Sequence, residues 1–143
     1  MGKLKDIKND LKKRLSEHRY THTESVAKTA LKIYESIDLS DYKETSFEDF
    51  AKRIELGAWL HDSCKELKKD ELMELAKFYK IKIYEEDKQA PNLLHARVGA
   101  AWIQDEYEIE DPYIFKAVEE HTFGGVDMLL SSKVVYLADM IEP

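Results

Sequence analysis

Hydrophobic positions recur at helical spacing along most of the chain. Between residues 21 and 37, Val26, Ala30, Ile33 and Ile37 repeat every three or four positions, which is the spacing of one face of an α-helix. Comparable stripes predict helices over residues 1–15, 21–37, 46–62, 72–79, 92–102, 111–123 and 131–143. Because no segment shows a convincing strand pattern, the predicted fold class is all-α, a bundle of about six or seven helices.

Residues that commonly begin and end helices mark the borders of these segments. Start signals occur at Thr21 with Glu24, Ser46 with Asp49, Asn92, and Asp111 with Pro112. Gly124 and Gly125 are expected to end the helix over 111–123. The segment 81–91 shows only weak alternation, so we predict a loop there with at most a brief extended piece.

The composition is that of one ordinary globular domain. The 143 residues are 43% hydrophobic and 36% charged, with five Gly and three Pro, which allows a core and argues against linkers. The single cysteine, Cys64, excludes an internal disulfide and indicates a reducing, cytoplasmic location. The segment 1–15 lacks the apolar core of a signal peptide, and we expect a basic amphipathic helix on the surface.

Charge and hydropathy narrow the classes of partner. No apolar run approaches the roughly 20 residues of a membrane span. A formal net charge of −7 disfavours nonspecific binding to nucleic acid, but it allows a small anion in a locally positive site. The expected partner is therefore a small ligand rather than a membrane or a nucleic acid, and the sequence leaves a homodimer open.

Most of the histidines lie on apolar stripes. Four of the five do so, each in a different predicted helix: His22, His61, His95 and His121. Asp62 and Asp139 lie beside or on such stripes, whereas His18 lies outside them and is expected at the surface. A single histidine on an apolar face is usually a hydrogen-bonded core residue. Six buried polar groups together are costly unless each is paired, and metal ions with nitrogen and oxygen ligands would satisfy them all.

The stretch WLHDSCKEL, residues 59–67, concentrates this chemistry. On a helix the adjacent His61 and Asp62 point about 100° apart, so they can share an ion only near the helix end. Lys65 lies three residues after Asp62 and faces the same way, although a solvated lysine is the alternative interpretation. Cys64 is expected to be a small buried hydrophobic residue rather than a ligand.

The order of these residues resembles a known family. His22, the pair His61-Asp62, and Asp139 resemble the H…HD…D set of the HD superfamily of metal-dependent phosphohydrolases, whose core is a helical bundle around a metal site. A closer resemblance, to the YqeK-type symmetrical bis(5′-nucleosyl)-tetraphosphatases, rests on five strings in the same order. These strings are RYTHT (19–23), LHDSCKEL (60–67), LLHARVGA (93–100), EEHTFGG (119–125) and KVVYLADMIEP (133–143).

The resemblance implies two divalent transition-metal ions, with iron as the expected metal. One ion would be held by His22, His61, Asp62 and Asp139, and the other by Asp62, His95 and His121. The residues implied near the substrate phosphates are Arg19, Lys65 and Thr122. Asp62 and Lys65 are the predicted catalytic pair. The family chain continues after the IEP string with an arginine and a further helix, so we expect a single HD domain over residues 1–143 without that helix.

The implied activity is symmetric cleavage of diadenosine tetraphosphate, or another bis(5′-nucleosyl) tetraphosphate, to two nucleoside diphosphates by attack of a metal-bound hydroxide. The sequence contains no P-loop, no Rossmann fingerprint and no serine nucleophile with a base, which agrees with this mechanism. One alternative is another HD phosphohydrolase acting on (p)ppGpp or deoxynucleotides, and the strings HTFGG and YLADMIEP argue against it. A second is a noncatalytic nucleotide-binding regulatory module, which has no physical need to retain six costly buried polar groups.

Overall fold

The chain is built from helices throughout the part that the structure, a computed structural model, describes, namely residues 2–37, 40, 42 and 49–142. The α-helices are α1 (Gly2–Arg14), α2 (Glu17–Ser36), α3 (Phe50–Leu60), α4 (Lys69–Phe78), α5 (Glu85–Gln89), α6 (His95–Tyr107), α7 (Pro112–Glu119) and α8 (Leu130–Ile141). A 3₁₀ turn, η2 (Pro91–Leu94), precedes α6. The all-α prediction is confirmed for these residues. Within them, no helix is both long and apolar enough to cross a bilayer.

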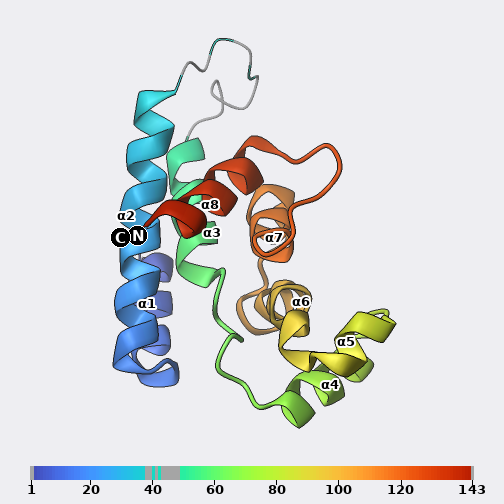
Figure 1. Cartoon of the computed structure of the whole chain (residues 1–143). Helices are drawn as coiled ribbons and strands as arrows, with labels where there is room; N and C mark the ends of the chain where they lie inside the picture. Colours follow the sequence, from blue (N-terminus) through green and yellow to red (C-terminus); the bar gives the residue numbers. More distant parts are fainter. Residues whose placement is uncertain (1, 38–39, 41, 43–48, 143) are drawn as a thin grey trace.

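The central bundle consists of α2, α3, α7 and α8, and α6 packs against α7 (Figure 1). Val26 and Ile54 face into this bundle from α2 and α3 and are fully buried. A Cβ atom at Gly57 would lie 3.1 Å from the Cβ of Ala117, so glycine lets α3 and α7 approach each other closely. Since His61 immediately follows α3, this close packing brings it toward the C-terminal end of α7.

The predicted start of α2 at Thr21 is wrong. The helix begins at Glu17 because Ser16 is its N-cap, with the Ser16 hydroxyl accepting a hydrogen bond from the backbone N–H of Arg19 (3.1 Å). Thr21 therefore lies within the second turn of α2 rather than at a border. As a result, Arg19 also belongs to the helix.

The segment 81–91 is also more helical than predicted. It contains the short helix α5, where Asp87 accepts a hydrogen bond from the backbone N–H of Tyr84 (2.8 Å). This helix raises the count to eight α-helices, instead of six or seven, among the described residues. Asn92 lies inside η2 and does not cap α6, whose N-cap is Leu94.

Among the remaining border signals, Asp111 is confirmed as the start of α7. Its carboxylate accepts a hydrogen bond from the backbone N–H of Tyr113 (2.9 Å). Ser46 lies outside the described residues, and Asp49 is the N-cap of α3 without a side-chain capping bond. α7 ends at Glu119, several residues before the glycine pair that was expected to end it.

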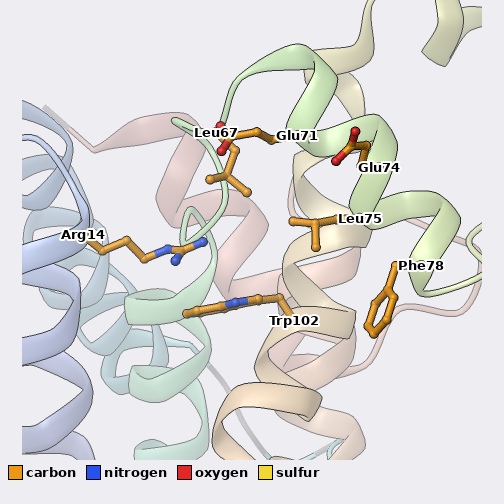
Figure 2. Close-up of a pocket in the computed structure, with 7 residues that line it drawn as sticks. All are labelled: Arg14, Leu67, Glu71, Glu74, Leu75, Phe78 and Trp102. Carbon is orange, nitrogen blue, oxygen red and sulfur yellow. The ribbon is translucent and has the colours of Figure 1, made fainter.

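The N-terminal helix α1 is anchored to the rest of the domain. Its residues Ile7 and Leu11 are buried in the core. Arg14 lies over the indole ring of Trp102 (4.1 Å from Cζ to the ring centroid), as Figure 2 shows, and its Nε donates to the backbone oxygen of Ser63 (2.8 Å). α1 therefore supports the turn that follows α3, and it is not merely a solvated surface helix.

Candidate metal and phosphate site

The six residues predicted as metal ligands converge from separate elements. His22 lies in α2, His61 and Asp62 directly follow α3, His95 begins α6, His121 follows α7, and Asp139 lies in the last turn of α8. His61 and Asp62 lie at the end of α3, the one place where the sequence analysis allowed them to share an ion. Five of these six side chains line one cavity of about 280 Å³, and the sixth, His61, is buried next to Asp62.

Asp62 lies at the centre of the cluster, with its side chain only 5% exposed. Its Oδ2 is 3.5 Å from Nε2 of His22 and 3.4 Å from Nε2 of His61. Its Oδ1 is 3.5 Å from Nε2 of His95 and 3.3 Å from Nε2 of His121. The two oxygens of one carboxylate therefore face two different pairs of imidazoles.

Asp139 lies beside the first of these imidazole pairs and forms a first group with His22 and His61; His95 and His121 form the second group. Its Oδ1 lies 3.0 Å from Nε2 of His22 and 3.5 Å from Nε2 of His61. In the second group, the Nε2 atoms of His95 and His121 are 3.1 Å apart. Two nitrogens that bind the same ion at about 2.0–2.1 Å lie roughly this far from each other, so both groups have the spacing of ligand sets.

The other ring nitrogen of each histidine is fixed by an acceptor. Nδ1 donates to a backbone oxygen three residues earlier in His61 (Ala58, 2.5 Å), His95 (Asn92, 2.8 Å) and His121 (Val118, 2.7 Å). In His22, Nδ1 instead donates to the carboxylate Oε1 of Glu142 (2.7 Å). Because an acceptor lies at every Nδ1, each ring in its neutral form would direct the lone pair of Nε2 into the cluster, where a metal ion would displace any proton.

The electrostatics of the cluster also favour a cation at its centre. Burial alone would lower the pKa of His61, but Asp62 and Asp139 outweigh it and raise the pKa to about 10. Burial would raise the pKa of Asp62, and the surrounding imidazoles, His61 first, instead hold it well below its usual range. Nε2 of His61 is buried without a hydrogen-bond partner among the described residues. A divalent ion would satisfy both the orphan nitrogen and the two carboxylates.

Three polar side chains predicted near the substrate line the same cavity: Arg19, Lys65 and Thr122. The Arg19 guanidinium donates to Oδ2 of Asp62 (3.1 Å), while its buried Nε has no partner in the described part of the chain. Oγ1 of Thr122 is likewise buried and unpaired there. These donors beside the cluster suit an anionic ligand, because a phosphate oxygen would pair with them.

Two further predictions, a surface position for His18 and a buried position for Cys64, are confirmed. His18 is exposed, and Cys64 is completely buried, where burial raises the pKa of its thiol. Glu142 was not predicted as a site residue, although it lies three residues after Asp139, a spacing that places both side chains on one face of a helix. Glu66 was not singled out from the sequence either, and its carboxylate accepts hydrogen bonds from both the backbone N–H (2.8 Å) and the hydroxyl (2.7 Å) of Ser16.

The chain is similar in sequence to proteins with known names. The chain is 36% identical over 133 residues to a protein of Bacillus subtilis (strain 168) named "Bis(5'-nucleosyl)-tetraphosphatase, symmetrical", covering 93% of this chain and 66% of that protein. A protein of Halalkalibacterium halodurans with the same name is 34% identical over 135 residues, covering 93% of this chain and 65% of that protein. The chain thus spans slightly less than two thirds of the length of these relatives.

A solved structure shares the fold. It is a predicted HD superfamily hydrolase involved in NAD metabolism from Clostridium acetobutylicum, with a TM-score of 0.82 and 27% sequence identity. The match covers 98% of this chain and 69% of that chain. The HD domain family itself matches residues 19–143, which include all six residues of the cluster. The chain therefore belongs to the HD domain family.

Proposed function

We propose that the protein is a metal-dependent hydrolase that cleaves diadenosine tetraphosphate, or a related bis(5′-nucleosyl) tetraphosphate, into two nucleoside diphosphates. The observation that carries this proposal is the position of Asp62, whose two oxygens face two separate imidazole pairs beside a cavity lined by Arg19, Lys65 and Thr122. The substrate comes from the similarity to the two relatives named symmetrical tetraphosphatases.

The cluster would hold two divalent transition-metal ions, with iron as the expected metal. The first ion would be bound by His22, His61 and Asp139 together with Asp62. The second ion would be bound by His95 and His121, again together with Asp62. When bound, such ions neutralise phosphoryl oxygens and activate water for attack on phosphorus.

The side chains at the cavity would bind and orient the polyphosphate. The Arg19 guanidinium can pair with two phosphate oxygens at once, and the Lys65 ammonium supplies a second positive charge. Thr122 would donate its unpaired hydroxyl to a phosphate oxygen. Together these contacts would hold one nucleoside diphosphate half with its terminal phosphorus at the cluster.

This placement makes the central cut the favoured one. The water oxygen bonds to the phosphorus held at the cluster, the bond from that phosphorus to the bridging oxygen breaks, and one proton is released to solvent. The other half leaves as a nucleoside diphosphate. An asymmetric cut would require three phosphates, or only one, on the cluster side, and the described cavity presents no cationic side chains beyond Arg19 and Lys65 for a third phosphate.

A panel of substrates tests this proposal against the two alternatives. Metal-loaded protein is incubated separately with diadenosine tetraphosphate, ppGpp, a deoxynucleoside triphosphate and NAD, and the products are separated by chromatography. We expect turnover of diadenosine tetraphosphate to ADP as the fastest reaction. Faster turnover of ppGpp or a deoxynucleotide would favour another HD phosphohydrolase, and binding without turnover of any compound would favour a noncatalytic nucleotide-binding module.

A further inference from the structure

We propose that an aromatic pocket beside the cluster, lined by Tyr84, Glu86, Asp87, Leu93, Arg97 and Phe123, binds the nucleobase of the nucleotide half held at the metal site. The inference rests on the proposed nucleotide substrate and assigns a binding site to its base. The pocket has a volume of about 360 Å³, enough for a purine ring system with part of its ribose.

The chain connects this pocket directly to the cluster on two sides. Leu93 lies two residues before His95, and Phe123 lies two residues after His121. Two residues span at most about 7 Å, so both pocket residues lie close to the backbone that carries the metal ligands. Thr122, between the pocket and His121, lines the phosphate cavity. A nucleotide with its phosphates at the cluster can therefore place its base here.

One wall of the pocket is held rigidly. The carboxylate of Asp87 accepts hydrogen bonds from the backbone N–H of Tyr84 (2.8 Å) and from the guanidinium of Arg97 (2.6 Å). Arg97 also donates to the backbone oxygen of Lys82 (2.8 Å), and its Cζ lies 5.4 Å from the centroid of the Tyr84 ring. Because these bonds join groups of the protein itself, a base would meet an ordered surface and lose little affinity to reorganisation.

The other feature that points to a base is an uncovered phenyl ring. Phe123 is 69% exposed, and Tyr84 in the same pocket is 47% exposed. Aromatic side chains stack on nucleobases, and this contact removes the exposed ring from water. Glu86 adds an acceptor for an exocyclic amino group, so we expect adenine, which carries such a group, to bind better than uracil.

The cavity of about 590 Å³ in Figure 2 does not have these properties. Its indole, Trp102, is covered on one face by the guanidinium of Arg14, 4.1 Å from the ring centroid. None of its lining residues lies within two positions of a cluster residue, so the chain does not join it to the phosphate cavity as it joins the pocket of Leu93 and Phe123. It does contain Phe78, which is 72% exposed and so provides a matched control for Phe123.

The test compares ligands with and without a base on metal-loaded protein. Isothermal titration measures the affinity for ADP, UDP and inorganic pyrophosphate in the wild type and in Phe123→Ala, Phe123→Trp and Phe78→Ala. We expect Phe123→Ala to weaken ADP binding about tenfold and to leave pyrophosphate binding unchanged, because stacking acts only on the base. Phe123→Trp should restore the affinity for ADP, and Phe78→Ala should change neither ligand.

The outcomes separate this inference from the proposed function. If the wild type cleaves diadenosine tetraphosphate but Phe123→Ala binds ADP normally, the base lies elsewhere and the inference is overturned. An equal loss for ADP and pyrophosphate would also overturn it, because the substitution would then act through His121 and the phosphate site. If the wild type binds pyrophosphate but gains nothing from the base and cleaves no dinucleotide, the proposed function itself fails.

Discussion

The carboxylate of Glu142 lies 2.7 Å from Nδ1 of His22, whose Nε2 lies 3.0 Å from Asp139. The other three histidines of the cluster are each oriented by a backbone oxygen, so His22 is the one imidazole there whose Nδ1 donates to a charged group. Asp139 first, and Glu142 with it, raise the pKa of His22. Glu142 therefore fixes the orientation of the His22 ring, and it would increase the electron donation of Nε2 to an ion bound by the proposed first group.

Glu142→Gln should selectively weaken the first metal site. The amide keeps the size of the side chain but removes its charge, and we expect about a tenfold loss of affinity for one of the two ions. The second group, formed by His95 and His121 with Asp62, should keep its ion. Metal content measured by elemental analysis after dialysis against a graded chelator checks this. Glu110→Gln, at an exposed position, is the control, and equal loss of both ions would contradict the assignment.

Asp62→Ala should remove more metal than His95→Ala. The carboxylate of Asp62 faces both imidazole pairs, whereas His95 belongs to one of them. We expect near-complete loss of metal in the first variant and loss of about one ion per chain in the second. Elemental analysis after anaerobic reconstitution gives the stoichiometry, and circular dichroism verifies that both variants remain helical. Identical stoichiometries would show that Asp62 does not bridge two ions.

Lys65→Ala should weaken nucleotide binding without changing the metal content. Its ammonium lines the phosphate cavity but belongs to neither ligand group. A partly solvated cation of this kind contributes about 1 kcal/mol, so the affinity for ADP should fall about fivefold. Titration calorimetry measures this change, and Lys69→Ala, at an exposed position outside the cavity, should have no effect. An unchanged affinity in Lys65→Ala would identify Lys65 as a solvated surface charge.

Glu66→Gln should lower the free energy of unfolding at neutral pH, and this loss should be smaller at acidic pH. The slight burial of Glu66 would raise the pKa of its carboxyl, but the two hydrogen bonds from Ser16 and the positive charge of Arg19 outweigh it and lower the pKa. A carboxyl whose pKa is lower in the folded chain stabilises the fold fully above its unfolded value, about 4.3, and loses this contribution as the pH falls through the lowered value. Because Glu66 is exposed, we expect the substitution to cost only about 1 kcal/mol.

Urea unfolding measured at about pH 7 and at about pH 3 tests this linkage, the lower pH being chosen below the pKa of an unpaired glutamate. The stability difference between wild type and Glu66→Gln should shrink at the lower pH. Glu110→Gln serves as the exposed control. A difference that stays constant or grows in acid would contradict the role assigned to the Ser16 contact.

The sequence predicts the cluster better than it predicts the helix borders. Hydrophobic periodicity places His22 and His121 on buried stripes because burial repeats with the helical period, whatever the residues at the ends. We expected α2 to start at Thr21 because Thr21 and Glu24 form a good local capping pattern. The helix instead starts after Ser16, which caps it and is also hydrogen-bonded to Glu66. A contact between residues far apart in the chain leaves no local signal.

The contacts that join separate elements are the part the sequence does not reveal. Glu142 has the correct spacing from Asp139, but only the packing of α2 beside α8 shows that it meets His22. The same holds for the pocket of Tyr84 and Phe123, because α5 lies in a segment whose weak alternation, without a helical stripe, predicted a loop. The sequence is enough to predict which side chains could bind a metal ion. Which side chains from distant parts of the chain contact each other can be known only from the three-dimensional structure.

The central claim is hydrolysis at the middle of the polyphosphate by water activated at the cluster around Asp62. The most direct measurement is the reaction of metal-loaded protein with diadenosine tetraphosphate in ¹⁸O-labelled water, with the products separated and analysed by mass spectrometry. We predict ADP as the sole nucleotide product, with one ¹⁸O atom on the terminal phosphate of one ADP in each pair. ATP together with AMP would contradict the symmetric cut, and ADP without the label would contradict attack by water.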